Sequence, residues 1–193
     1  LVCDVMGHGV RAGLLTALIR GIVEEVGPHA RDAAQVLGEI NRALMPIVHQ
    51  TGQPVFATAF YAVVDSAART LSFGNAGHPP PLLLRAATGA VEQLLLADPE
   101  PATGLIEDFV YTSHESPFSP GDVFLGYTDG LFEAGDASGS QFGEDRLRTF
   151  LAQRTGVPGA ALLDQLVAEI VAFTGRAQFD DDICALTVEA ARL

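Results

Sequence analysis

Three aspartates stand at the ends of apolar runs in distant parts of this chain, and their type and placing suit metal chemistry. They are Asp4 in L-V-C-D-V-M-G-H-G, Asp129 in V-F-L-G-Y-T-D-G and Asp181 in F-D-D-D-I-C-A-L-T-V. Proteins build oxygen-rich sites for Mg²⁺ or Mn²⁺ from carboxylates that distant segments deliver at strand ends, because these ions prefer hard ligands. The pattern therefore predicts a divalent metal centre.

Each aspartate also has a plainer interpretation. Aspartate before glycine is a common turn residue, so Asp129 taken alone would be read as part of a T-D-G turn. The acidic residues 180–182 could form a solvated turn before a strand, although adjacent carboxylates repel each other and a cation relieves that repulsion. We expect Asp181 to be the ligand, with its two acidic neighbours behind it or at the surface. The metal interpretation depends on the three aspartates acting together.

Two histidines near these motifs have different expectations. His78 lies between Gly77 and three prolines, which favours a structural hydrogen bond in a rigid turn. His8 adjoins the first aspartate, and the sequence leaves a structural and a chemical role equally open for it. Asn75 and Glu133 are expected to form backbone or loop hydrogen bonds.

The composition restricts the class of protein. Hydrophobic residues make up 48% of the 193 residues, as in a globular protein, and we expect one domain over residues 1–193. A net charge of −13 repels phosphate backbones and anionic lipid surfaces, so nucleic acid and membrane are not expected partners. Cys3 and Cys184 cannot form a dense disulfide framework and fit a reducing cytoplasm. No apolar stretch approaches the roughly 20 residues that a bilayer requires.

Hydrophobic periodicity predicts the elements that must position the aspartates. One helix is expected at about 11–26, and a second begins behind an Asp32 cap and ends near Pro46. The β-branched and aromatic residues from Val55 predict a long hairpin with a turn at 65–69. Further strands are expected at 81–84, 91–96, 109–115, 123–127 and 183–189, and further helices at about 144–154 and 159–174. This order indicates an α+β fold with mainly antiparallel pairing.

Four motifs together carry a resemblance to a known family. They are D-V-M-G-H-G at the start, N-A-G-H-P-P-P-L at 75–82, T-D-G-L-F-E-A at 128–134 and D-D-I at 181–183. With these motifs the chain resembles the bacterial SpoIIE-type branch of the metal-dependent PPM (protein phosphatase 2C-like) serine/threonine phosphatases. Each motif alone is a weak signal, but four in the family's order over nearly the whole chain are specific.

The resemblance implies a fold, a cofactor and a partner. The fold is a four-layer α/β/β/α sandwich of two mainly antiparallel sheets flanked by helix pairs. The cofactor is two Mn²⁺ or Mg²⁺ ions, with Asp4 bridging them, the Val5 carbonyl binding one, and Asp129 and Asp181 completing the ligands. The implied role is cytoplasmic partner switching in sigma factor regulation, with a phosphorylated anti-anti-sigma (STAS) protein as substrate. Homodimerisation is left open.

Such a site would hydrolyse a phosphoserine or phosphothreonine by direct attack of water. Two cations about 4 Å apart hold a hydroxide in line and neutralise the phosphoryl oxygens, so no covalent phosphoenzyme is needed. The catalytic aspartates then act as a template and charge counterweight. Gly7, His8 and Gly9 precede the first helix, where unpaired N–H groups and the helix dipole favour an anion, and we expect them to shape the phosphate approach.

The chain also departs from the family pattern. The branch has a hairpin with a further acidic group before the first motif, so we expect N-terminal strands to be missing and the chain to be the C-terminal part of a longer signalling protein. Missing strands expose a sheet edge, which puts the activity of this fragment in doubt. Cys3 replaces the usual Gly before Asp4, and Cys184 replaces the usual Thr after D-D-I.

Two further function classes stay open. A catalytically impaired phosphatase-like module, acting as a regulatory binding domain, is motivated by the missing N-terminal portion, and the strength and number of bound metal ions would distinguish it. A hydrolase with a Ser or Cys nucleophile ranks low, because the sequence has no G-x-S-x-G elbow and no Cys/His pairing.

Overall fold

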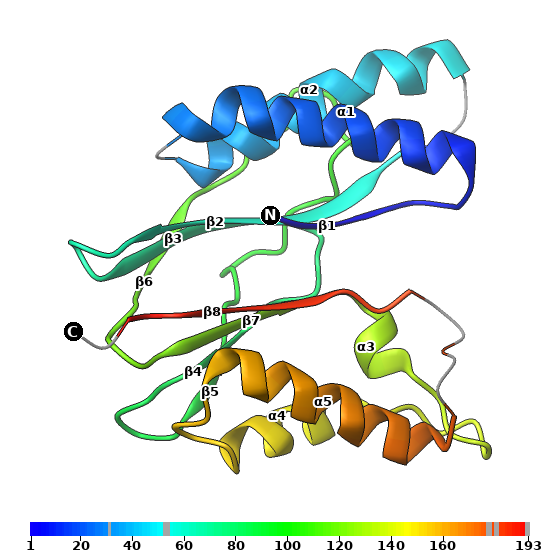
Figure 1. The fold of residues 1–193 in the computed structure, drawn as a ribbon. Helices are drawn as coiled ribbons and strands as arrows, with labels where there is room; N and C mark the ends of the chain where they lie inside the picture. The colour runs from blue at the N-terminus through cyan, green and yellow to red at the C-terminus, as the bar shows by residue number, and fades with distance from the viewer. Residues whose placement is uncertain (31, 52–54, 177–178, 180–181, 192–193) are drawn as a thin grey trace. The chain divides into compact units, whose positions relative to one another are not determined.

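The computed structural model describes residues 1–30, 32–51, 55–176, 179 and 182–191. The chain divides into two compact units. The first consists of Leu1–His78 and Leu96–Pro117, and the second of Pro79–Leu95 and Phe118–Leu193. Each unit contains one four-stranded sheet with its own helices (Figure 1).

The sheet of the first unit has the order β1-β2-β3-β6 with antiparallel pairing throughout. Its strands are β1 (Val2–Val5), β2 (Ala57–Asp65), β3 (Thr70–Ala76) and β6 (His114–Pro117). The expected hairpin is confirmed as β2 and β3, and its turn is closed by Asp65 Oδ1, which accepts hydrogen bonds from the N–H groups of Ala67 and Ala68. Within the described chain β1 is an edge strand.

Two helices cover one face of this sheet. They are α1 (Val10–Val26) and α2 (Ala33–Thr51), joined through the short 3₁₀ helix η1 (Gly27–His29), and they lie side by side in Figure 1. The core between helices and sheet includes Leu15 and Ile19 of α1 and alternate residues Ala57, Ala59 and Tyr61 of β2. Alternation thus turns one face of β2 to the helices and the other away from them.

Two boundaries in the first unit differ from the sequence prediction, and one helix start agrees with it. The predicted cap is confirmed, since Asp32 Oδ1 accepts from Ala34 N at 2.9 Å. The predicted end of α2 near Pro46 is wrong, because the helix continues to Thr51. Proline removes one helical hydrogen bond, and here Ile47 and Val48 beyond it still pack on the core. The strand predicted at 109–115 begins later, at His114.

The second unit has a sheet of order β5-β4-β7-β8, also antiparallel. Its strands are β4 (Leu82–Leu84), β5 (Val91–Gln93), β7 (Val123–Tyr127) and β8 (Ala185–Glu189), and its helices are α3 (Gly130–Glu133), α4 (Glu144–Ala152) and α5 (Gly159–Thr174). Helix α5 has the predicted bounds, whereas β5 is shorter than expected and α3 was not predicted. The core joins alternate residues of β7 to α4 and α5.

The α+β class with antiparallel sheets is therefore confirmed. In the described ranges, none of the helices combines the length and apolar character that a bilayer crossing needs.

Candidate functional site

Asp4 and Val5 lie at the end of the edge strand β1. Asp4 stands opposite Thr58 of β2, and Val5 stands opposite Ala57. The backbone groups of Ala57 are both engaged with Thr103, at 3.0 and 2.9 Å, and Met6 N donates to Phe56 O at 3.0 Å. Because hydrogen-bonded and non-bonded pairs alternate in an antiparallel ladder, Val5 directs its carbonyl away from β2, toward the outer edge of the sheet. That carbonyl therefore makes no ladder hydrogen bond to β2, and its role as a ligand stays a prediction.

The Asp4 side chain lies on the sheet face that is turned away from α1 and α2. Its partner Thr58 alternates with Ala57 and Ala59, which pack on the helices. Asp4 is exposed. Thr58 Oγ1 lies 2.9 Å from Nδ1 of His78, a side chain that is 4% exposed. A buried imidazole therefore fixes the hydroxyl directly across the ladder from Asp4.

His78 is held by the turn in which it lies. Asn75 Nδ2 donates to the carbonyl of His78 at 2.9 Å, and His78 N donates to Asn75 Oδ1 at 2.7 Å. Gly77 has φ +66°, and a Cβ there would lie 3.0 Å from Ala102 N. Asn75 and His78 therefore form the structural hydrogen bonds that the sequence predicts for them.

The loop after β1 contains the predicted phosphate-approach residues. Gly7 and Gly9 have φ +89° and +82°, in the left-handed region that favours glycine. His8 lies between them and is exposed. Gly9 is the N-cap of α1, and no side chain caps this end of the helix. The first-turn N–H groups of α1 are thus not occupied by a side-chain cap, while the role of the loop stays a prediction.

Cys3 precedes Asp4 on the strand and faces the helices. Burial, and secondarily the charge of Asp4, raise the pKa of its thiol to about 12. The thiol is therefore protonated at neutral pH, and a protonated thiol is a poor nucleophile. This agrees with the low rank of a Cys-nucleophile hydrolase.

Asp129 belongs to the second unit, just after β7. It is the N-cap of α3, and its Oδ1 accepts a hydrogen bond from Gly130 N at 3.0 Å. The side chain is partly buried, and within the described residues the second carboxylate oxygen makes no hydrogen bond. Asp129 is thus a turn residue, as the plainer interpretation of T-D-G predicts. Its cap uses Oδ1 and leaves Oδ2 outside this hydrogen bond.

Thr128, the neighbour of Asp129, contacts the acidic segment near the C-terminus. Its N–H donates to the carbonyl of Cys184 at 3.0 Å, its Oγ1 accepts from Cys184 N at 3.1 Å, and Oγ1 donates to the carbonyl of Asp182 at 3.4 Å. Asp129 and the segment that begins at Asp182 therefore meet at one end of the second sheet. Asp181 itself lies outside the described residues.

The predicted ligands are thus distributed over three places. Asp4 and Val5 lie in the first unit, Asp129 in the second, and Asp181 outside the described residues. Among the residues that the structure describes, no group of three or more His, Cys, Asp or Glu side chains is arranged to hold a metal ion. The joint ligand set stays a prediction.

The donors that are present fit a hard divalent cation. They are an exposed carboxylate, a backbone carbonyl at a sheet edge and a carboxylate oxygen left open by its cap, all of them oxygen atoms. Mg²⁺ and Mn²⁺ bind such ligands, whereas Zn²⁺ in proteins is bound mostly by nitrogen and sulfur.

Sequence reasoning missed Thr58 and Thr128. Neither stands in a position that periodicity singles out, because each acts through a cross-strand neighbour. The register Asp4 opposite Thr58 and the contact of Thr128 with residues 182–184 are properties of strand pairing. The sequence signal for Thr128 is its place in the T-D-G motif, which the structure joins to the residues of the D-D-I motif far along the chain.

Comparisons with known proteins identify the family of this chain. Residues 1–191 match the family described as Stage II sporulation protein E (SpoIIE). Phosphoserine phosphatase RsbP of Bacillus subtilis is 28% identical over 134 residues, which are 69% of this chain and 32% of that protein. The chain spans between 20% and 40% of the length of the curated relatives it matches.

Solved structures share the fold over almost the whole chain. The SiaA-PP2C domain of Pseudomonas aeruginosa matches with a TM-score of 0.81 and 28% identity, covering 97% of this chain and 73% of that one. RsbX, solved in complex with magnesium, matches with a TM-score of 0.66 and 16% identity, covering 96% of this chain and 77% of that one. The fold is that of PP2C-type phosphatase domains.

Proposed function

The chain belongs to the SpoIIE family, and on this premise we propose that residues 1–193 form a protein phosphatase domain that hydrolyses phosphoserine or phosphothreonine. The observation that carries the proposal is the family match over residues 1–191, which includes Asp4, Val5 and Asp129. A relative named phosphoserine phosphatase supports the reaction class. Because the chain covers a minor part of that relative, the activity of the whole protein belongs to the proposal.

The reaction is proposed to depend on Mn²⁺ or Mg²⁺. Support comes from the oxygen donors at the end of β1 and after β7, and from the magnesium in the RsbX structure. Asp4, the Val5 carbonyl, Asp129 and Asp181 would hold the ions, two in a complete domain. When bound, such ions supply a hydroxide at neutral pH and neutralise phosphoryl charge.

Neighbouring residues of the chain hold these oxygen donors in place. The Gly130 N–H holds one oxygen of Asp129, so the other keeps a defined direction. The hydrogen bond between His78 and Thr58 fixes the side chain across from Asp4. Gly7, His8 and Gly9 would leave the first turn of α1 accessible to the phosphate. No side chain of the chain forms a covalent intermediate in this proposal.

The substrate is proposed to be a phosphorylated regulatory protein of the STAS type. RsbP and RsbU, both named phosphoserine phosphatases, support a serine-phosphorylated partner. Cytoplasmic partner switching and a homodimer belong to the same proposal.

The test is phosphate release by the full-length parent from a phosphorylated STAS protein, with and without Mn²⁺. We expect Mn²⁺-dependent release that Asp129→Asn reduces by at least about 100-fold, because the substitution removes a charged ligand while asparagine keeps the helix cap. The matched control is Asp164→Asn, an exposed aspartate on α5, which should release phosphate at the wild-type rate.

Two outcomes would contradict the proposal. Release that needs no metal would exclude the metal-activated water. Binding of the phosphorylated protein without any release, in the complete parent with Mn²⁺, would favour the alternative of a catalytically impaired module that acts by binding.

A further inference from the structure

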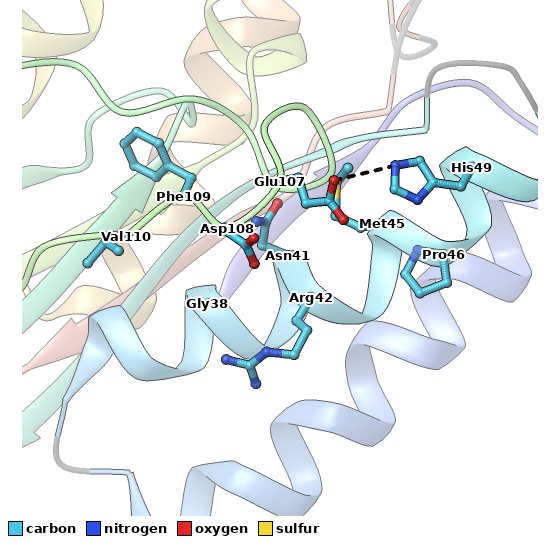
Figure 2. A pocket seen from close by; sticks show the side chains of 10 residues that line it. All are labelled: Gly38, Asn41, Arg42, Met45, Pro46, His49, Glu107, Asp108, Phe109 and Val110. Carbon is cyan, nitrogen blue, oxygen red and sulfur yellow. Dashed lines mark ion pairs between the residues drawn. The ribbon is translucent and has the colours of Figure 1, made fainter.

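A pocket of about 320 Å³ lies within the first unit, on the side of α2 that faces the loop 104–110. We call it the α2 pocket. Figure 2 shows residues of this loop beside residues of α2, with the ion pair between Glu107 and His49 dashed. Its lining is Gly38, Asn41, Arg42, Met45, Pro46, His49, Glu107, Asp108, Phe109 and Val110. None of these residues belongs to the proposed metal site.

The loop that forms one wall has a fixed shape. Asn41 is 3% exposed, and its amide donates to the carbonyl of Ile106 at 3.0 Å and accepts from Gly104 N at 2.7 Å. Gly104 has φ +90°, and a Cβ there would lie 2.3 Å from the carbonyl oxygen of Val55. Since Asn41 ties both Gly104 and Ile106 to the helix, the start of the loop is held in place before any ligand binds, which lowers the entropic cost of binding.

Apolar side chains are exposed around this fixed loop. Val110 is 82% exposed, and Leu105 and Ile106 are 49% and 50% exposed. Met45 and Phe109 add apolar area to the pocket wall. A cluster of exposed apolar groups on a rigid loop, beside a pocket and rimmed by polar residues, is typical of a protein interaction site.

The charged side chains of the pocket leave Asp108 without a basic partner in the described chain. His49 Nε2 lies 3.8 Å from Glu107 Oε2, and Arg42 pairs with Glu39 one turn earlier on α2. Asp108 has no hydrogen bond or ion pair within the described chain. Its φ of +55° is the left-handed conformation, which asparagine and aspartate tolerate better than most residues. The pocket therefore offers an apolar wall and, at Asp108, a carboxylate that no basic side chain of the described chain pairs with.

From these observations we propose that the α2 pocket binds a short segment of a partner protein, in which an arginine or lysine stands next to an aliphatic or aromatic side chain. The basic group pairs with Asp108, and the apolar group packs against Phe109, Val110 and Met45. A second copy of this chain fits this pocket poorly, because a chain with 24 acidic and only 11 basic residues has few basic groups to offer Asp108. The same charge disfavours nucleic acid and anionic lipid. The inference goes beyond the phosphatase reaction and needs no catalytic activity.

The test is a selection of random short peptides on the full chain, followed by fluorescence polarisation with the synthesised winners. The selected peptides are expected to contain a basic residue beside an aliphatic or aromatic one. Asp108→Asn should weaken their binding about tenfold, as does the loss of a charge-assisted contact. Asparagine keeps the left-handed backbone, so the fold should be unchanged, which thermal unfolding checks. Val110→Ser should weaken binding by a similar factor.

The matched controls are Asp164→Asn and Val167→Ser on α5, an exposed acidic and an exposed apolar residue outside the pocket. Both should bind the peptides as the wild type does. The proposal is overturned if selection enriches no peptide, if the enriched peptides lack a basic residue, or if Asp108→Asn and Val110→Ser leave binding unchanged. Self-association that Val110→Ser disperses would assign the pocket to a second copy and also overturn it.

Discussion

At the scale of single residues, a buried histidine holds the side chain that stands opposite Asp4 on the next strand. His78 is 4% exposed, and its ring lies at hydrogen-bond distance from Thr58, across the ladder from Asp4. A buried polar group that loses a partner destabilises the fold by more than its hydrogen bond contributes when formed. The Thr58 hydroxyl is therefore a structural requirement beside the first aspartate.

Thr58→Val tests that requirement. The two side chains are nearly equal in shape, so the change removes the hydroxyl that contacts His78 Nδ1 at 2.9 Å. We expect the free energy of unfolding to fall by about 2 kcal/mol, measured by urea denaturation. Thr16→Val on exposed α1, whose hydroxyl donates to the carbonyl of Ala12, should change it by less than about 0.5 kcal/mol. Equal stability of Thr58→Val and wild type would contradict the assigned role.

The sequence predicted residues whose motif is local and missed those whose partner is distant. Asn75 and His78 were expected to form loop hydrogen bonds, because N-A-G-H-P is a turn motif by its own residues. Thr58 could not be recognised, since its importance comes from its register with β1 across more than 50 residues of chain. Strand register depends on tertiary pairing, and a single sequence does not specify it.

At the scale of elements, the predictions failed where side chains outside the element decide its limits. The sequence predicts a helix end near Pro46, but α2 and its apolar stripe continue beyond it. The strand predicted at 109–115 forms only from His114, so residues 109–111 lie outside it. There Phe109 and Tyr111 pack in a T-shaped pair with centroids 4.9 Å apart, and this segment pairs with no strand in the described chain. The alternation of apolar side chains here reflects their burial, although the backbone makes no sheet hydrogen bonds to other described residues.

The loop before β6 gives a prediction at this scale. Gly104→Ala combines a left-handed backbone with a Cβ 2.3 Å from the Val55 carbonyl, so we expect a loss of about 3 kcal/mol or more in unfolding free energy. Gly139→Ala is the matched control: its φ is +83°, but nothing lies within 4 Å of the added Cβ. Its loss should be about 1 kcal/mol, from backbone strain alone. Similar losses for both variants, in urea denaturation, would mean that the close approach at Gly104 has no energetic weight.

At the scale of the whole molecule, charge and family membership carry different information. The net charge of −13 makes the chain attract cations in general, so weak stabilisation by any salt is expected. The family match over residues 1–191 supplies what charge cannot, a reaction class, while Asp4, Val5 and Asp129 stay predicted ligands. Sequence reasoning named these three residues from motifs. The fourth, Asp181, lies outside the described residues, so the complete ligand set is a matter for a binding experiment.

Mn²⁺ binding should therefore be measured as stability. A ligand at about 100 times its Kd that binds only the folded state raises the free energy of unfolding by about 2.7 kcal/mol. We expect a gain of this size for the wild type and for Asp164→Asn, and little gain for Asp129→Asn. Asparagine can still cap α3 as Asp129 does, so the variant should fold without metal. NaCl at equal ionic strength should raise the free energy of unfolding of all three proteins by the same amount, because charge screening needs no specific binding site. If Asp129→Asn gained as much from Mn²⁺ as the wild type, the stabilisation would come from the −13 charge and Asp129 would not be a ligand.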